Sequence, residues 1–291
     1  MENKNIKDMP MDWWKSEEEA RILNLWFKRH IIALQIGYLL EGKACNFYAS
    51  GFLLLYQKRC LWITAGHVIQ KIDKLFQNIK CDIKRTAWID NNEINIPSEC
   101  NTIPFDYLQA RKFSINNDTM DLGVIRLEGN CLELIARNHS NEWFTEEVWM
   151  NNNLSNPDGF FLVGYPDETK VCGNEERSDG NYSISKISCI SNPVEKIARK
   201  ESDEKEFWNY PDWFYGKVLP ITKDDDTKLN NIEGMSGGPI LGIERTPDER
   251  VIYKLFGIQS SWLPQSKILR ATPIENVITL IDEAIKTNDD N

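Results

Sequence analysis

The chain has 291 residues, of which 41% are hydrophobic and 11% are aromatic, with ten tryptophans. This length suits one two-lobed β protein or two small domains, and the aromatic content predicts a large packed core and excludes a disordered chain. The formal net charge is −10, the sequence pI is near 5.0, and Lys and Arg form no basic stripe. Nucleic acid is therefore not expected as a direct partner.

Seven cysteines are scattered along the chain without a Cys-x-x-Cys pair, so the spacing of metal ligands is absent. We interpret the cysteines as mostly reduced and buried, which fits a reducing compartment. The first residues are charged and lead into no signal-peptide core, and no apolar run approaches the length of a membrane span. The sequence thus predicts a cytoplasmic protein with no membrane contact, no metal and no cofactor.

Residues 1–29 are expected to form an N-terminal helical arm, and residues 30–291 to form the main domain. Ser16 and Glu19 match the capping box of a helix start, and apolar residues then recur at helical spacing between Ile22 and Phe27. A helix packed on the domain explains this pattern. An arm that docks a regulator or an activating protein partner is the alternative.

From Ile31 the pattern changes to strand-like runs, which predict a first lobe at about residues 30–128. A short helix interrupts these strands at Val68–Phe76. The predicted strands of this lobe are Ile31–Leu40, Phe47–Tyr56, Leu61–Thr64, Cys81–Ile89, Tyr107–Ile115 and Asp121–Leu127.

A second lobe is predicted at about residues 159–273, after a connection at 128–158. The charge-rich segment Pro193–Trp208 is expected to be a solvated loop or short helix, and Asp224–Asp226 an exposed loop rather than a metal site. An amphipathic C-terminal helix is expected at 274–287. The predicted strands are Phe160–Val163, Ser183–Ile190, Val251–Ile258 and Ile268–Pro273, with a further apolar run at Ile240–Ile243.

Three short motifs carry candidate chemistry. Ile232–Ile240 places Ser236 among three glycines just before an apolar run. Glycine backbones allow the N–H groups of Gly234 and Ser236 to point at one spot, as an oxyanion hole requires. A serine hydroxyl also needs a base and a carboxylate that orients the base. His67 ends one apolar run and Asp121 begins another, so both types of residue are available.

The chain resembles the chymotrypsin/trypsin-like serine peptidases in these three motifs, Thr64–His67, Asp121–Ile125 and Gly234–Pro239. The likeness is greatest to bacterial HtrA-type peptidase domains without a PDZ domain, and it covers roughly Ile31 to Val277. The order His, Asp, Ser is that family's order. The resemblance implies an all-β fold of two six-stranded antiparallel barrels with the site in the cleft between them, plus terminal helices.

The resemblance also implies a serine endopeptidase that forms an acyl-enzyme. Ser236 would be the nucleophile, His67 the general base and Asp121 the residue that orients the base, with Asp118 as a competitor for the last role. Met235 stands where secreted zymogens carry an aspartate, which disfavours activation by cleavage. An oxyanion loop ordered by substrate or by a partner is expected instead.

A protein or peptide substrate is expected to bind extended, by β-addition to the strand edge that follows the serine motif. No carboxylate stands six residues before Ser236, so no strong preference for Lys or Arg is expected, and Trp262 would narrow the pocket. The predicted substrate-binding residues are Asn230, Gln259, Ser260, Ser261 and Trp262.

Two other functions stay open from the sequence. The fold can serve as a latent or non-catalytic module that binds a partner, with the three residues held apart. An esterase is the second alternative, although the order of residues and the missing Gly-x-Ser-x-Gly elbow count against it.

Overall fold

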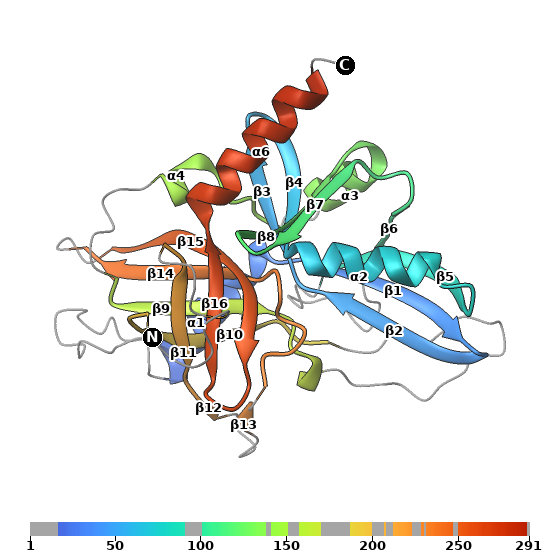
Figure 1. The fold of residues 1–291 in the computed structure, drawn as a ribbon. Coiled ribbons are helices and arrows are strands. Elements are labelled where there is room, and N and C mark those ends of the chain that lie inside the picture. Colours follow the sequence, from blue (N-terminus) through green and yellow to red (C-terminus); the bar gives the residue numbers. More distant parts are fainter. Residues whose placement is uncertain are drawn as a thin grey trace.

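A computed structural model places the chain in two β lobes that lie side by side, with a helix near each end of the chain (Figure 1). The first lobe is built from strands β1 to β8, and the remaining strands follow in the second. The residues that the structure describes are 17–90, 101–137, 141–150, 157–169, 187–199, 207, 212–222, 228–229, 231–246 and 250–289.

The second lobe contains a closed six-stranded antiparallel barrel in the order β10-β11-β16-β15-β14-β9. One buried cluster of its apolar side chains includes Leu162, Ile240 and Leu269, which are fully buried. One of the two predicted six-stranded barrels is therefore present. The strands are β9 (Gly159–Gly164), β10 (Ile190–Lys196), β11 (Phe214–Val218), β14 (Pro239–Arg245), β15 (Val251–Leu263) and β16 (Ile268–Pro273), with a separate short ribbon of β12 (Ile221–Thr222) and β13 (Lys228–Leu229).

In the described residues the first lobe has two four-stranded antiparallel sheets, β2-β1-β5-β6 and β3-β4-β8-β7, which do not confirm the closed six-stranded barrel predicted for this lobe. The predicted strand Phe47–Tyr56 is divided at Ser50 and Gly51, where the chain passes from one sheet to the other. Glycine is required at this bend, because a Cβ on Gly51 would lie 2.3 Å from the Trp62 ring. The strands are β1 (Ala33–Leu40), β2 (Lys43–Ala49), β3 (Phe52–Tyr56), β4 (Arg59–Thr64), β5 (Cys81–Asp90), β6 (Asn101–Pro104), β7 (Lys112–Asn117) and β8 (Met120–Arg126).

Helices brace the lobes from outside. The helix α2 follows β4 directly and packs against β7 and β8. The C-terminal helix α6 packs on β15 and β16 and also reaches the first lobe, where the Tyr56 hydroxyl donates a 2.6 Å hydrogen bond to Asp282. The helices are α1 (Glu17–Phe27), η3 (Lys28–His30), α2 (Gly66–Gln77), α3 (Gly129–Arg137), α4 (Glu146–Trp149), η4 (Asp167–Thr169) and α6 (Ile274–Asp289).

The largest buried cluster draws on both lobes and on both terminal helices. It combines Val124 of the first lobe with Phe161 of the second, and adds Phe27 from α1 and Val277 from α6. Burial of one such large apolar side chain stabilises a fold by about 1.5–3 kcal/mol. Apolar packing therefore fixes how the two lobes sit against each other, and with that the geometry between them.

The predicted N-terminal helix is present as α1. Leu23 and Phe27 are buried, and the Trp26 ring meets the Tyr253 ring edge-on, with 4.1 Å between centroids. The capping residue Ser16 lies outside the described residues. These contacts give α1 a structural role on the second lobe, and docking of a partner by the arm stays a prediction.

One part of the second lobe was predicted incorrectly. Strand β10 includes Pro193 to Lys196, where a solvated loop or short helix was expected. It begins at Ile190, where the predicted strand ends, and Ile187–Cys189 is not a strand. The reason is tertiary: β10 closes the barrel by pairing with β9 and β11, and this pairing buries Asn192 and Val194 despite the charged residues that follow. The predicted Asp224–Asp226 loop lies outside the described residues.

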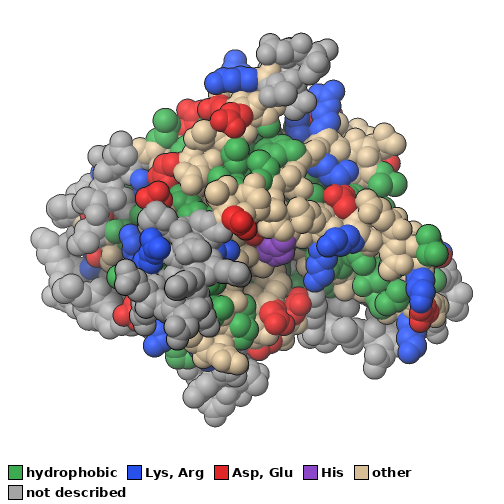
Figure 2. Space-filling view, viewed as in Figure 1, with side chains coloured by type: hydrophobic (Ala, Val, Ile, Leu, Met, Phe, Trp, Pro, Cys, Tyr) green, Lys and Arg blue, Asp and Glu red, His purple; other side chains and the backbone are tan. Residues whose placement is uncertain are grey.

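The chemistry of the described residues adds two observations. The five cysteines within them are all free. Acidic and basic side chains are interspersed on the face that Figure 2 shows. Among the described residues, no helix has both the length and the apolar character needed to span a membrane.

Candidate active site

His67 lies in the first turn of α2, which follows β4 almost directly. Ala65 is extended, and the helix begins at Gly66. Glycine allows this helix start to lie against β7, because a Cβ on Gly66 would be 2.0 Å from the carbonyl oxygen of Ile115. Val68 is buried beneath the helix, while the His67 side chain is 37% exposed. The local sequence thus places an imidazole at the surface on a rigid base.

Asp121 lies at the start of β8 and accepts two hydrogen bonds from His67. Its Oδ2 is 2.8 Å from His67 Nδ1, and its Oδ1 accepts from the backbone N–H of the same residue at 2.9 Å. The carboxylate is nearly buried, so both bonds form away from bulk solvent. A proton on Nδ1 satisfies this contact and leaves Nε2 as the basic nitrogen. Asp118, the alternative, is exposed in the turn before β8.

Ser236 lies in a tight turn between two glycines with left-handed backbones. Gly234 has φ +89° and Gly237 has φ +92°, values that favour glycine. The fully buried Met235 side chain anchors the turn in the barrel core. The N–H of Gly237 donates to the carbonyl of Gln259 at 2.9 Å, which ties the turn to β15.

Two hydrogen bonds from distant parts of the chain hold the loop before Ser236. The N–H of Asp167 donates to the carbonyl of Glu233 at 2.7 Å, and the Ser50 hydroxyl donates to the carbonyl of Gly234 at 2.6 Å. Because the C=O and N–H of a trans peptide point in opposite directions, the first bond turns the N–H of Gly234 away from Asp167. Within the described residues, the N–H groups of Gly234 and Ser236 donate no hydrogen bond.

The fold brings the serine turn against the segment that carries the histidine. A Cβ on Gly237 would lie 2.0 Å from Thr64 Oγ1 and 2.8 Å from the backbone nitrogen of Ala65. Even so, no hydrogen bond joins Ser236 Oγ to His67 Nε2 within the described part of the chain. The histidine–carboxylate contact is formed and the serine–histidine contact is open. Catalytic hydrogen bonds are often long in unliganded enzymes.

The predicted substrate-binding residues are only partly placed. Asn230 lies outside the described residues. The side chains of Gln259 and Ser260 are buried, and the Ser261 hydroxyl accepts from Arg270 at 3.0 Å. Trp262 packs against the barrel cluster. Strand β15 pairs with β14 as far as Ile258, and Gln259 then bonds to Gly237 and Gly238, so in the described residues β15 is paired on one side only after Gln259.

Ser50 was missed by sequence reasoning. Its side chain is fully buried, and its Oγ accepts from the N–H of Tyr165 at 2.9 Å while donating to Gly234. Its carbonyl accepts from Thr64 Oγ1 at 2.7 Å. A serine beside Gly51 inside an apolar run was the available signal. The side-chain partners of Ser50 are 115 and 184 residues away in the sequence, so only the fold reveals them.

The described residues contain no group of three or more His, Cys, Asp or Glu side chains able to hold a metal ion. Within the described residues, the arrangement is therefore an imidazole held by a carboxylate, a serine in a tight turn between two left-handed glycines, and two N–H groups that donate no hydrogen bond there. These are groups that transfer protons and stabilise an oxyanion.

Comparison with known proteins finds similarity in structure alone. No family model matches the chain, and no curated protein matches its sequence. A protease from M. tuberculosis in its active form is 11% identical, with a TM-score of 0.43 over 91% of this chain and 85% of that one. The protease Anisep from Arthrobacter nicotinovorans is 14% identical, with a TM-score of 0.40 over 85% of this chain and 93% of that one.

A catalytically inactive tobacco etch virus protease, solved in complex with substrate, is 11% identical to the chain. Its TM-score is 0.37 over 85% of this chain and 78% of that one. All three similar structures are thus proteases by their descriptions. At such identities the similarity concerns the path of the chain, so the function is argued from the geometry of the site.

Proposed function

We propose that the chain is a serine endopeptidase that hydrolyses peptide bonds through an acyl-enzyme. Ser236 is the nucleophile, His67 the general base and Asp121 the carboxylate that orients the base. The observation that carries this proposal is the double hydrogen bond from His67 to Asp121, at 2.8 and 2.9 Å. It fixes the ring and supports the tautomer in which Nε2 accepts a proton.

The proposed reaction uses only groups of this chain and water. His67 Nε2 takes the hydroxyl proton as Ser236 Oγ attacks the substrate carbonyl, and the N–H groups of Gly234 and Ser236 receive the oxyanion. The intermediate collapses, and the imidazolium gives its proton to the leaving amine. Water then attacks the acyl-enzyme, with His67 again taking and returning one proton. Each proton that the imidazole takes is returned, so the enzyme ends unchanged.

The substrate is proposed to be an extended peptide that adds to β15. Because β15 is paired on one side only beyond Gln259, its backbone there can pair with another strand. Of the five predicted residues, Ser261 and Trp262 are partly exposed at this edge. We further propose that residues 30–291 form an HtrA-type core and that the protein is cytoplasmic. A partner or ligand controls its activity.

A latent or non-catalytic partner-binding module is the second candidate function. The specific observation in its favour is the missing hydrogen bond between Ser236 Oγ and His67 Nε2. In a latent protein, binding of a partner or substrate would close this contact. In a non-catalytic module, the contact would stay open under every condition.

The test is labelling of the folded chain with a fluorophosphonate probe, followed by intact mass and peptide mapping. We expect one adduct at Ser236, which Ser236→Ala and His67→Ala abolish. Asp121→Asn should slow labelling by about 10⁴-fold, because it reverses the preferred tautomer. Ser266→Ala removes an exposed hydroxyl in the turn after β15 and should label like the wild type.

The other outcomes decide between the alternatives. A folded wild type that stays unlabelled supports the latent or non-catalytic module. An adduct at another serine rejects the proposed site. If Ser236 is labelled but the chain hydrolyses a simple ester and no peptide of a broad library, the enzyme is an esterase.

A further inference from the structure

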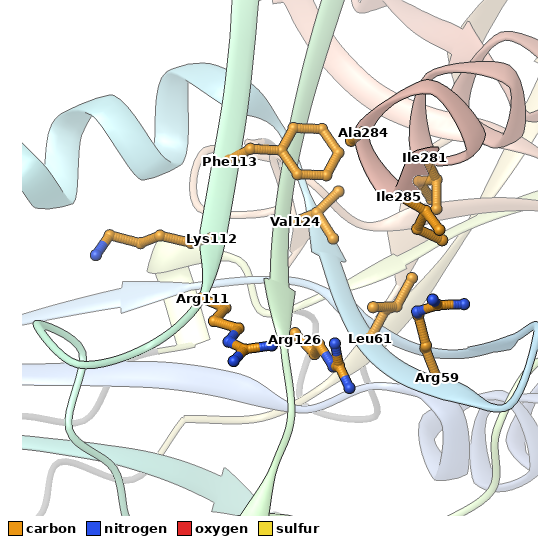
Figure 3. A pocket seen from close by; sticks show the side chains of 10 residues that line it. All are labelled: Arg59, Leu61, Arg111, Lys112, Phe113, Val124, Arg126, Ile281, Ala284 and Ile285. Atoms are coloured by element: carbon orange, nitrogen blue, oxygen red, sulfur yellow. The ribbon is translucent and has the colours of Figure 1, made fainter. Parts of the chain in front are cut away.

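A cavity of about 420 Å³ lies between the C-terminal helix and the sheet β3-β4-β8-β7 (Figure 3). This volume is within the range of small-molecule sites. Side chains alternate between the two faces of a strand, so Val124 in the cavity wall lies on the opposite face of β8 from Asp121. The cavity is therefore separate from the candidate active site. Its apolar walls are Leu61, Phe113, Val124, Ile281, Ala284 and Ile285.

Three of the apolar wall residues are also buried in the core. Leu61, Val124 and Ile281 are each less than 5% exposed, although they face the cavity. Strand β8 contributes Val124 and pairs with β7, where Phe113 lies directly opposite. These side chains provide a firm apolar surface for the body of a ligand.

Basic side chains gather at one end of the same cavity. Figure 3 shows Arg111 and Arg126 below Phe113 and Val124, with Arg59 on the far side of Leu61, whereas the Lys112 ammonium points away from the arginines. Glu128 lies among the arginines, 2.7 Å from Arg126 Nε and 3.8 Å from Arg111 Nε. One carboxylate thus serves two guanidinium groups, which leaves this end with an excess of positive charge.

The position of Lys112 supports this division of the cavity. Its Nζ donates to the carbonyl of Tyr107 at 3.0 Å and lies over the Tyr107 ring, 4.3 Å from the centroid. The positive charge of Lys112 therefore interacts with Tyr107, outside the cavity. The charge available to a ligand comes from guanidinium groups, which form paired hydrogen bonds with carboxylate and phosphate oxygens.

We propose that this cavity binds a small amphiphile that has one anionic headgroup, a carboxylate or a phosphate, on an apolar body. The headgroup pairs with Arg126 and Arg111, and the body lies between Val124, Phe113 and the face of α6 that carries Ile281. This proposal is independent of the peptidase proposal, since no proposed catalytic residue lines the cavity. The ligand touches β4 and β8, the strands that position His67 and Asp121, without contacting either residue.

The test is isothermal titration calorimetry on the full chain at low ionic strength, with octanoate and octyl phosphate as probes. We expect one site with a dissociation constant of about 1 mM or lower for at least one of them. Neutral 1-octanol and tail-free acetate should each bind at least about tenfold more weakly. The reason is that 1-octanol lacks the anionic headgroup and acetate lacks the long apolar body. The tighter of the two anionic probes identifies the headgroup.

Three variants locate the site. Arg126→Gln removes one cation and should weaken binding at least about tenfold, the value of one charge-assisted hydrogen bond. Ala284→Phe fills the cavity from α6, keeps every charge and should abolish binding. Arg137→Gln is the matched control, because this exposed arginine pairs with Glu133 on α3 outside the cavity and should leave affinity unchanged. Thermal unfolding of each variant verifies its fold.

Two results would overturn the proposal. One is no binding of octanoate or octyl phosphate at about 10 mM, a concentration well above the expected dissociation constant. The other is binding that a folded Ala284→Phe variant retains at wild-type affinity, which would place the ligand elsewhere. Neither result bears on labelling of Ser236, so the two proposals fail separately.

Discussion

Ser50 should position the loop that precedes the nucleophile. Its buried hydroxyl joins two backbone groups of the second lobe, the carbonyl of Gly234 at 2.6 Å and the N–H of Tyr165 at 2.9 Å. Ser50→Ala leaves both groups without this partner in a site where Ser50 is fully buried. An unsatisfied buried group costs about 1–3 kcal/mol, so for two such groups we expect a loss of about 2–6 kcal/mol in the free energy of unfolding.

The same change should slow the chemistry. Without Ser50 Oγ, the loop before Ser236 loses one of the two hydrogen bonds to distant parts of the chain described above and keeps the one from Asp167 to Glu233. Losing one oxyanion donor entirely costs about 10²–10³ in rate, and a loosened donor should cost less. We expect fluorophosphonate labelling of Ser236 to slow by about tenfold or more. Urea unfolding and labelling rates, measured on the same preparation, give the two quantities.

Tyr107→Phe is the matched control for Ser50→Ala. The Tyr107 hydroxyl is also buried and donates a 2.8 Å hydrogen bond to Asp73, but it lies in the first lobe away from the serine loop. This variant should lose about 1–2 kcal/mol of stability without a change in labelling rate. If Ser50→Ala is destabilised yet labels Ser236 at the wild-type rate, Ser50 has a structural role only and the reasoning fails.

Two further predictions concern stability. Gly237→Ala should cost about 3 kcal/mol or more, because its Cβ would lie 2.0 Å from Thr64 Oγ1 at φ +92°, and an unchanged urea midpoint would contradict this. Burial lowers the pKa of His30 to about 4, although its contact with Glu142 acts in the opposite direction. As the pH falls below 6.5, His30 becomes protonated in the unfolded chain while it stays neutral in the folded chain. The free energy of unfolding therefore falls between pH 6.5 and 4, by about 2 kcal/mol between pH 7.5 and 5. His30→Phe should flatten that part of the urea-derived profile, and a slope equal to the wild type's would refute the assignment.

Much of the architecture was readable from local patterns. The helix before Phe27, the run of strands from Ala33 to Arg126 and the C-terminal helix follow from apolar periodicity, which acts over a few residues. The three motifs were readable for the same reason. Each combines a special backbone requirement, such as the left-handed Gly234 and Gly237, with a reactive side chain nearby in the sequence.

Tertiary pairing decided what periodicity left open. Strand β10 is stabilised by pairing with β9 and β11, which closes the barrel, although its sequence is charged and contains Pro193. The break at Gly51 divides one predicted strand between the two four-stranded sheets of the first lobe. Short sequence windows hold no information on such partners, because strand pairing joins distant residues.

The candidate site divides in the same way. Residue types, their order and the resemblance of the three motifs to a serine peptidase family indicated His67, Asp121 and Ser236. The contacts depend on the fold: the 2.8 Å bond from His67 to Asp121 crosses 54 residues, and the bond from Ser50 to Gly234 crosses 184. The cavity behind β8 exists only because α6 returns to the first lobe. Chemistry resides in single side chains, but distance, burial and enclosure depend on packing between remote segments.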